Sequence, residues 1–131
     1  MAKSNDTSQW RQLREFPDVD LMRSFVLSWH VEADTLLVDV DVCLMREHPF
    51  YEKPRPAEKA CIRPARIEFP YCEALGRDGG SEGELVEIAA NLGHGAISNF
   101  RRLSDARYEM SGEFGTVFID AERPVFKLVR P

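Results

Sequence analysis

The sequence predicts an all-β domain, an antiparallel sandwich or barrel of roughly seven to eight strands with a short N-terminal helix. Three observations support this fold class. Apolar and polar residues alternate along most of the chain beyond residue 24, which is the period of a strand with one buried face. Turn-forming residues separate the alternating segments at spacings of about eight to twelve residues. Finally, 131 residues with 44% hydrophobic side chains suffice for one domain with its own core.

The N-terminal part is expected to precede the sheet. Residues 1–9 are polar and are predicted to be a flexible N-terminus, and residues 10–131 are predicted to form a single β-rich domain. Trp10 and Leu13 have the spacing of one helix face, and they follow an Asp-Thr-Ser run whose side chains are suitable N-caps. We therefore expect a short helix that ends before Pro17.

A β-hairpin is the first feature expected in the sheet. Residues 25–31 and 36–44 alternate in polarity, and the four residues between them, 32–35, provide the turn. One register places the apolar side chains on a single buried face. That register pairs Val31 with Leu36, Trp29 with Val38, Leu27 with Val40 and Phe25 with Val42.

The remaining chain is expected to add strands to this hairpin. Residues 46–59 contain three prolines, which cannot donate to a ladder, so they are predicted to form a long loop. Residues 60–69 alternate again, although Pro64 restricts them to an edge or a bulge. Residues 76–83 hold four of the eight glycines and mark a connection. Five segments follow, most of them predicted strands: residues 85–92, 96–103, 107–114, 116–121 and 125–129.

The overall charge limits the partners that we expect. Seventeen Lys and Arg against twenty-two Asp and Glu give a net charge of −5, which disfavours nucleic acid and anionic lipid. No apolar run approaches the roughly 18 residues of a membrane span, and the first residues lack the apolar stretch of a secretory signal. We therefore expect a cytoplasmic protein with no nucleic-acid partner, no membrane and no cofactor, and its oligomeric state stays open.

The cysteines suggest neither a disulfide framework nor a zinc site. Cys43, Cys61 and Cys72 are odd in number and show no Cys-x-x-Cys spacing, so we expect buried or half-buried reduced thiols. Cys43 is in phase with Asp39 and Asp41 along its strand, so core burial explains this cysteine poorly.

Four segments resemble a group of small bacterial proteins of unknown function. These segments are residues 24–29 (SFVLSW), 47–54 (EHPFYEKP), 61–70 (CIRPARIEFP) and 111–115 (SGEFG). The likeness covers most of the chain beyond residue 20. It implies a bacterial, single-domain protein, and because it includes no catalytic signature it transfers no functional residue.

The proline-rich loop is the first candidate for a functional surface. Its aromatic residues stand among prolines, and stiff loops with exposed aromatic side chains lose little entropy on docking. The alternative is that the aromatic side chains fold inward and cover one end of the core, and both can hold at once. The candidate partner-binding residues are His48, Phe50, Tyr51, Pro54 and Pro56. Because no catalytic spacing is present, we expect a nonenzymatic protein-interaction domain.

The second candidate is a polar face of the hairpin. In the predicted register Ser28 faces Asp39, His30 lies diagonally from Asp39, and Asp41 follows on the same face. One imidazole and two carboxylates, His30, Asp39 and Asp41, are ligand types for a divalent cation, so the alternative function is a small-molecule or metal-binding β-domain, with or without catalysis. The simpler interpretation is the solvated face of a hairpin, which is polar in any case.

Overall fold

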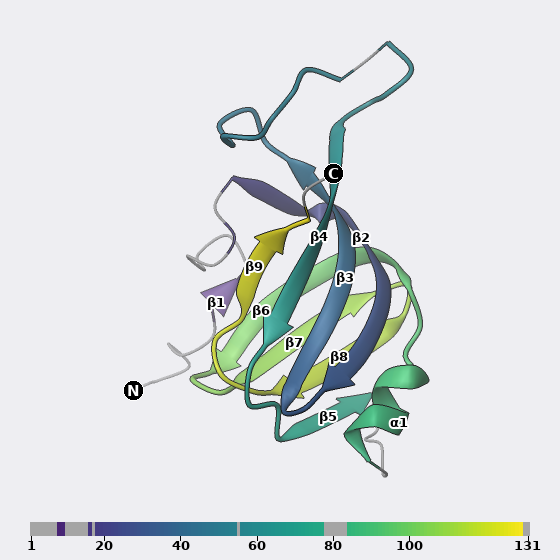
Figure 1. Ribbon diagram of the computed structural model, residues 1–131, viewed down its shortest axis with the longest axis vertical. Helices are drawn as coiled ribbons and strands as arrows, with labels where there is room; N and C mark the ends of the chain where they lie inside the picture. Colours follow the sequence, from purple (N-terminus) through teal and green to yellow (C-terminus); the bar gives the residue numbers. More distant parts are fainter. Residues whose placement is uncertain (1–7, 10–15, 17, 55, 78–83, 130–131) are drawn as a thin grey trace.

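The described part of the chain forms a single antiparallel sheet with one short helix (Figure 1). The computed structural model describes residues 8–9, 16, 18–54, 56–77 and 84–129. These residues contain nine strands and one helix: β1 (Ser8–Gln9), β2 (Val19–Glu32), β3 (Thr35–Leu44), β4 (Cys61–Phe69), β5 (Ala74–Arg77), α1 (Leu85–Ala90), β6 (Gly95–Ser104), β7 (Arg107–Gly112), β8 (Gly115–Asp120) and β9 (Val125–Leu128). The antiparallel all-β prediction is confirmed.

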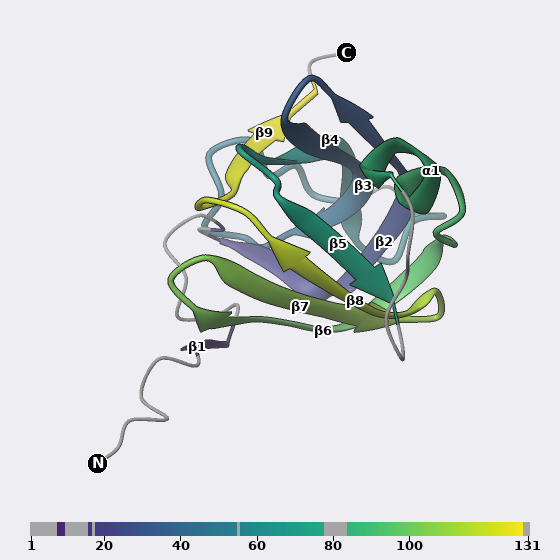
Figure 2. The same ribbon diagram turned by 90° about the horizontal axis from the view of Figure 1, so that it is seen from below.

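The sheet bends over itself at the junction of β2 and β6. Its strand order is β5-β8-β7-β6-β2-β3-β4-β9, and β1 pairs with β6 outside this path. Only two residue pairs join β2 to β6, Phe25 with Ala96 and Val26 with Gly95. The half made of β2, β3, β4 and β9 therefore crosses over the half made of β6, β7, β8 and β5 (Figure 2).

The sheet is open, so the barrel alternative is wrong. In the part of the chain that the structure describes, β5 pairs only with β8 and β9 only with β4, which leaves both ends of the strand order free. A barrel requires the first and last strands to pair with each other. The short β5 and β9, of four residues each, offer little length for such a ladder.

Aromatic rings fill the space between the two halves. Phe100 of β6 is fully buried and lies 5.3 Å from Phe16, 6.2 Å from Phe69 of β4 and 5.9 Å from Tyr108, measured between ring centroids. Phe69 also packs edge-on against Tyr108 at 5.7 Å. Since these rings come from β4, β6, β7 and the segment before β2, the two halves share one core.

The predicted N-terminal helix is not supported. Ser8–Gln9 forms β1 and pairs with Arg101 and Arg102 of β6, whereas residues 10–15 and 17 lie outside the described residues. The helix of the described chain is instead Leu85–Ala90, in a segment that we grouped with the predicted strands. Leu85, Ile88 and Ala89 lie on one face of this helix, and together with Leu92, just beyond its end, they contribute to the core or pack against it.

The predicted hairpin register is confirmed over the half near the turn. Val31 pairs with Leu36 and Trp29 with Val38, and both Trp29 and Val38 are buried. Ser28 also faces Asp39, as predicted.

A β-bulge then shifts the register, so the predicted pairs Leu27 with Val40 and Phe25 with Val42 are wrong. Val26 pairs with Val40 and Phe25 with Asp41, because Leu27 is an extra residue in β2. Val26 is 1% exposed, whereas Phe25 and Leu27 are 44% and 48% exposed. The bulge lies beside the only β2–β6 pairs, so it coincides with the bend of the sheet.

Candidate functional site

The proline-rich loop between β3 and β4 projects beyond the sheet (Figure 1). Its first part is ordered by two consecutive turns. The His48 N–H donates to the Met45 carbonyl at 2.9 Å, and the Tyr51 N–H donates to the His48 carbonyl at 3.0 Å. The Phe50 N–H also donates to His48 Nδ1 at 3.0 Å. These bonds order the backbone of residues 45–51, which carries the two aromatic residues of the loop.

The two aromatic residues of the loop point to different environments. Tyr51 is half-buried and packs against the core cluster, whereas the Phe50 side chain is 60% exposed. Tyr51 therefore fits the interpretation that the loop covers one end of the core, and Phe50 fits the interpretation that the loop exposes an aromatic surface. Pro54 is half-buried, and Pro56 is exposed.

A groove of about 680 Å³ lies between this loop and the ends of β4 and β9. We call it the Phe50 groove, and its lining residues are Pro49, Phe50, Tyr51, Glu52, Arg63, Pro64, Leu128 and Val129. Six of these eight residues are apolar or aromatic. The structure therefore brings Phe50 and Tyr51 of the predicted surface together with residues distant in sequence, whereas His48, Pro54 and Pro56 do not line the groove.

The charged groups of the Phe50 groove neutralise each other. Arg63 Nη2 donates to Glu52 Oε1 at 2.7 Å, and Arg63 Nη1 donates to the Ile62 carbonyl at 2.7 Å. The Glu52 carboxylate thus balances the Arg63 guanidinium at the groove wall. A groove with an apolar lining and no net charge suits an uncharged, apolar group.

The three candidate metal ligands lie on the outer face of the β2–β3 hairpin, where Asp39 is already engaged. Arg66 Nε donates to Asp39 Oδ1 at 2.8 Å, and Ser28 Oγ donates to Asp39 Oδ2 at 3.1 Å. His30 Nδ1 lies 3.9 Å from the same Oδ2 atom. Asp41 stands beside Phe25 and Pro64 in the neighbouring strands. In the described residues no group of three or more His, Cys, Asp or Glu side chains is arranged to hold a metal ion.

Two opposing influences set the pKa of Asp39. Burial is the largest influence and raises the pKa, but the hydrogen bonds from Arg66 and Ser28, with the charges of Arg66 and His30, outweigh it and hold the pKa below 3.8. Since the ionised form is favoured in the folded state, the carboxylate stabilises the fold. This stabilisation is fully present above pH 3.8 and is lost as the pH falls through the lowered pKa.

The Asp39→Asn variant tests this cross-strand contact. We expect it to lower the free energy of unfolding at pH 7 by no more than about 1 kcal/mol, because a partly exposed ion pair is solvated. The difference from wild type should shrink at a pH well below 3.8. Urea unfolding at both pH values measures it, and an unchanged difference at the lower pH would show that the carboxylate charge is not its source.

All three cysteines are free and buried, as predicted for structural thiols. Burial raises the pKa of Cys43, and it raises the pKa of Cys72 to about 11. Cys43 is 5% exposed but does not belong to the core cluster, which agrees with the expectation that core burial explains this cysteine poorly. Its cross-strand neighbours are Asp20 and Ile62, and its N–H donates to the buried Ser24 Oγ at 3.0 Å. Thiols with raised pKa values are poor nucleophiles near neutral pH.

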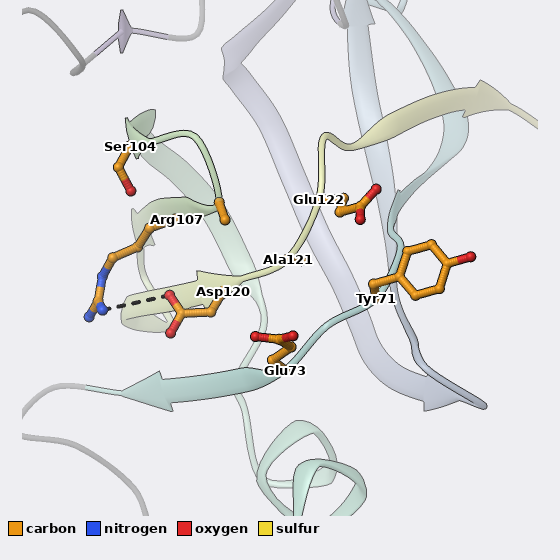
Figure 3. Close-up of a pocket in the computed structure, with 8 residues that line it drawn as sticks. Tyr71, Glu73, Ser104, Arg107, Asp120, Ala121 and Glu122 are labelled. Atoms are coloured by element: carbon orange, nitrogen blue, oxygen red, sulfur yellow. Dashed lines mark ion pairs between the residues drawn. The ribbon is translucent and has the colours of Figure 1, made fainter.

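A second hollow, of about 440 Å³, lies at the ends of β7 and β8 (Figure 3). The polar side chains that line it are Tyr71, Glu73, Ser104, Arg107, Asp120 and Glu122. Arg107 Nη1 lies 3.6 Å from Asp120 Oδ1. Sequence reasoning did not identify this hollow, because its residues come from three separate segments that only the pairing of β5, β7 and β8 brings together. None of these polar side chains is buried, so their charges are solvated.

Comparison with known proteins adds no further assignment. No protein-family model matches the chain, and no match is found among curated proteins or among solved structures. Within the described residues no helix is both long and apolar enough to cross a membrane.

Proposed function

We propose that this chain is a protein-interaction module that holds an apolar part of a partner protein in the Phe50 groove. The observation that carries the proposal is the position of Phe50, which is 60% exposed beside a groove whose lining is mainly apolar. An exposed aromatic side chain beside a concave apolar surface is the usual arrangement of an interface anchor. The ordered turns and the prolines of the loop reduce the entropy lost on docking.

The Phe50 groove supports binding better than the other candidate surfaces do. It is larger than the polar hollow of Figure 3, about 680 Å³ against 440 Å³, and its one ion pair is internally balanced. At the hairpin face, a cation would have to displace Arg66 from Asp39. The proposal includes a cytoplasmic location, and it includes no catalysis because the sequence shows no catalytic spacing.

Partner capture with single variants tests the proposal. Wild type, Phe50→Ala and Tyr51→Ala are immobilised, and captured proteins are quantified by mass spectrometry. Loss of an aromatic anchor costs about 2 kcal/mol or more, so we expect Phe50→Ala to weaken capture of the true partner by roughly thirtyfold. Tyr51→Ala should weaken it as well, although its effect includes lost packing against the core.

Phe25→Ala is the matched control for this experiment. Phe25 is 44% exposed on β2 and does not line the Phe50 groove, so its removal deletes a similar aromatic area elsewhere. We expect Phe25→Ala to capture the same partner as wild type. If Phe50→Ala and Tyr51→Ala keep every protein that wild type captures, the assignment of this surface is wrong.

A further inference from the structure

Among the described strands, β9 lies at the edge of the sheet. In the part of the chain that the structure describes, only β4 pairs with it. The Val129 N–H donates to the Pro64 carbonyl at 3.0 Å, and the ladder continues through Lys127 opposite Arg66. Because backbone groups alternate in direction along an antiparallel strand, the N–H and C=O groups of Phe126 and Leu128 point away from β4. An extended chain can pair with these groups.

The free edge of β9 leads directly into the Phe50 groove. Leu128, the last residue of β9, and Val129, which is 50% exposed, both line it. A strand that pairs with Phe126 and Leu128 therefore passes the groove within one or two residues of its pairing positions. Pairing with the edge and insertion of a side chain into the groove are compatible in a single extended segment.

The charge on β9 indicates what kind of chain fits. The Lys127 side chain is 59% exposed in the middle of the strand, and its ammonium lies 3.2 Å from Glu68 Oε1. An ammonium group has three donors, so it can also bind a carboxylate on an incoming strand. One antiparallel register of two copies, which pairs Phe126 with Leu128, is unfavourable because it places Lys127 opposite Lys127. The exposed Lys127 ammonium therefore favours a partner segment that carries an acidic residue at this position.

We propose, on the basis of the proposed function, that the partner supplies an extended segment that adds to β9 as a further strand. An acidic residue of that segment lies beside Lys127, and an apolar residue enters the Phe50 groove. The backbone bonds provide affinity, and the two side-chain positions provide specificity.

A peptide selection on the full chain tests this inference. Random peptides displayed on phage are selected against the wild-type protein, and the consensus peptide is synthesised as the probe. We expect the consensus to alternate apolar residues with at least one Asp or Glu. On binding, the backbone amides of Phe126 and Leu128 should exchange with solvent more slowly by about tenfold or more, while amides of the opposite edge, β5, should not change.

A charge exchange tests the position of Lys127. We expect Lys127→Glu to lower the affinity for the acidic consensus peptide by about tenfold. A peptide with Lys in place of its acidic residue should bind this variant more tightly than the acidic peptide does. Lys53→Glu is the matched control, since Lys53 is exposed on the loop and lines neither the groove nor β9, and it should change the affinity little. Equal weakening by both variants would overturn the assigned position of the acidic residue.

The outcomes separate the strand addition from the proposed function. If the probe requires Phe50 but leaves the amides of Phe126 and Leu128 unprotected, strand addition is overturned and the Phe50 groove stands. If the probe protects these amides and binds Phe50→Ala as tightly as wild type, strand addition stands and the proposed use of the groove is overturned. If no selected peptide slows the exchange of the Phe126 and Leu128 amides, strand addition is overturned.

Discussion

Replacing Phe100 by alanine is expected to lower the free energy of unfolding by about 3 to 5 kcal/mol. The Phe100 side chain is fully buried where the two halves of the sheet meet, and its ring contacts those of Phe16, Phe69 and Tyr108. Its removal leaves a cavity that the surrounding strands cannot close without breaking ladders. Because domains of this kind are stable by only about 5 to 15 kcal/mol, the loss is a large fraction of the total.

The same substitution at an exposed phenylalanine is the control. Phe50→Ala removes an identical group from a side chain that is 60% exposed, so we expect a change within about 0.5 kcal/mol. Denaturant unfolding of both variants, followed by circular dichroism, gives the two values. Comparable losses for Phe100→Ala and Phe50→Ala would contradict a core built around Phe100.

Replacing Gly112 by alanine is expected to destabilise the fold by about 3 kcal/mol. A Cβ atom at Gly112 would overlap the Ala96 carbonyl oxygen and the Phe114 ring, closer than real Cβ atoms approach their neighbours. The carbonyl belongs to β6 and accepts the Glu113 N–H at 3.0 Å, so backbone would have to move to relieve the overlap. The tight approach lies where β6 and β7 meet beside the bend of the sheet.

Gly76→Ala is the matched control. Gly76 lies in β5, and no atom outside its immediate chain neighbours lies within 4 Å of a Cβ built there. The substitution should be neutral or stabilising by up to about 1 kcal/mol, because alanine restricts the unfolded chain. Thermal melts compare the two. If Gly112→Ala and Gly76→Ala have the same melting temperature, the close approach of β6 and β7 at Gly112 is not present in solution.

Local patterns predicted those parts of the fold in which sequence neighbours are also spatial neighbours. The turn half of the β2–β3 hairpin is correct, because the alternation around Trp29 and Val38 fixes which face is buried. The predicted register on the N-terminal side of Ser28 is wrong, because Leu27 forms a bulge at the bend of the sheet. Since Phe25 and Leu27 are both apolar, the alternation does not reveal this bulge. Alternation alone cannot identify which of several consecutive apolar residues is the extra one.

The helix α1 shows a different kind of error. Leu85, Ile88, Ala89 and Leu92 have helical spacing, and this signal was present in the sequence. The prediction grouped residues 85–92 with four other segments, most of them predicted strands, although the period of this segment indicates a helix. The helical spacing of the apolar residues therefore indicates this element in the sequence itself.

Only one wall of the Phe50 groove could be predicted from the sequence. The composition of the loop identified Phe50 and Tyr51 as an aromatic surface among prolines. The opposite wall, Leu128 and Val129, lies more than 70 residues away and reaches the loop only because β9 pairs with β4. No local pattern encodes that pairing, so the groove and the edge position of β9 among the described strands become visible only in the folded chain.

The most direct measurement of the central claim is site-specific photo-cross-linking of the full chain in cells. A photoreactive phenylalanine analogue replaces Phe50 in one variant and Phe25, a comparably exposed phenylalanine away from the Phe50 groove, in another. If the groove binds a partner protein, position 50 yields a defined cross-linked protein that position 25 does not yield. Equal products from both positions, or a product from position 25 alone, would contradict the assignment of the Phe50 groove as the binding surface.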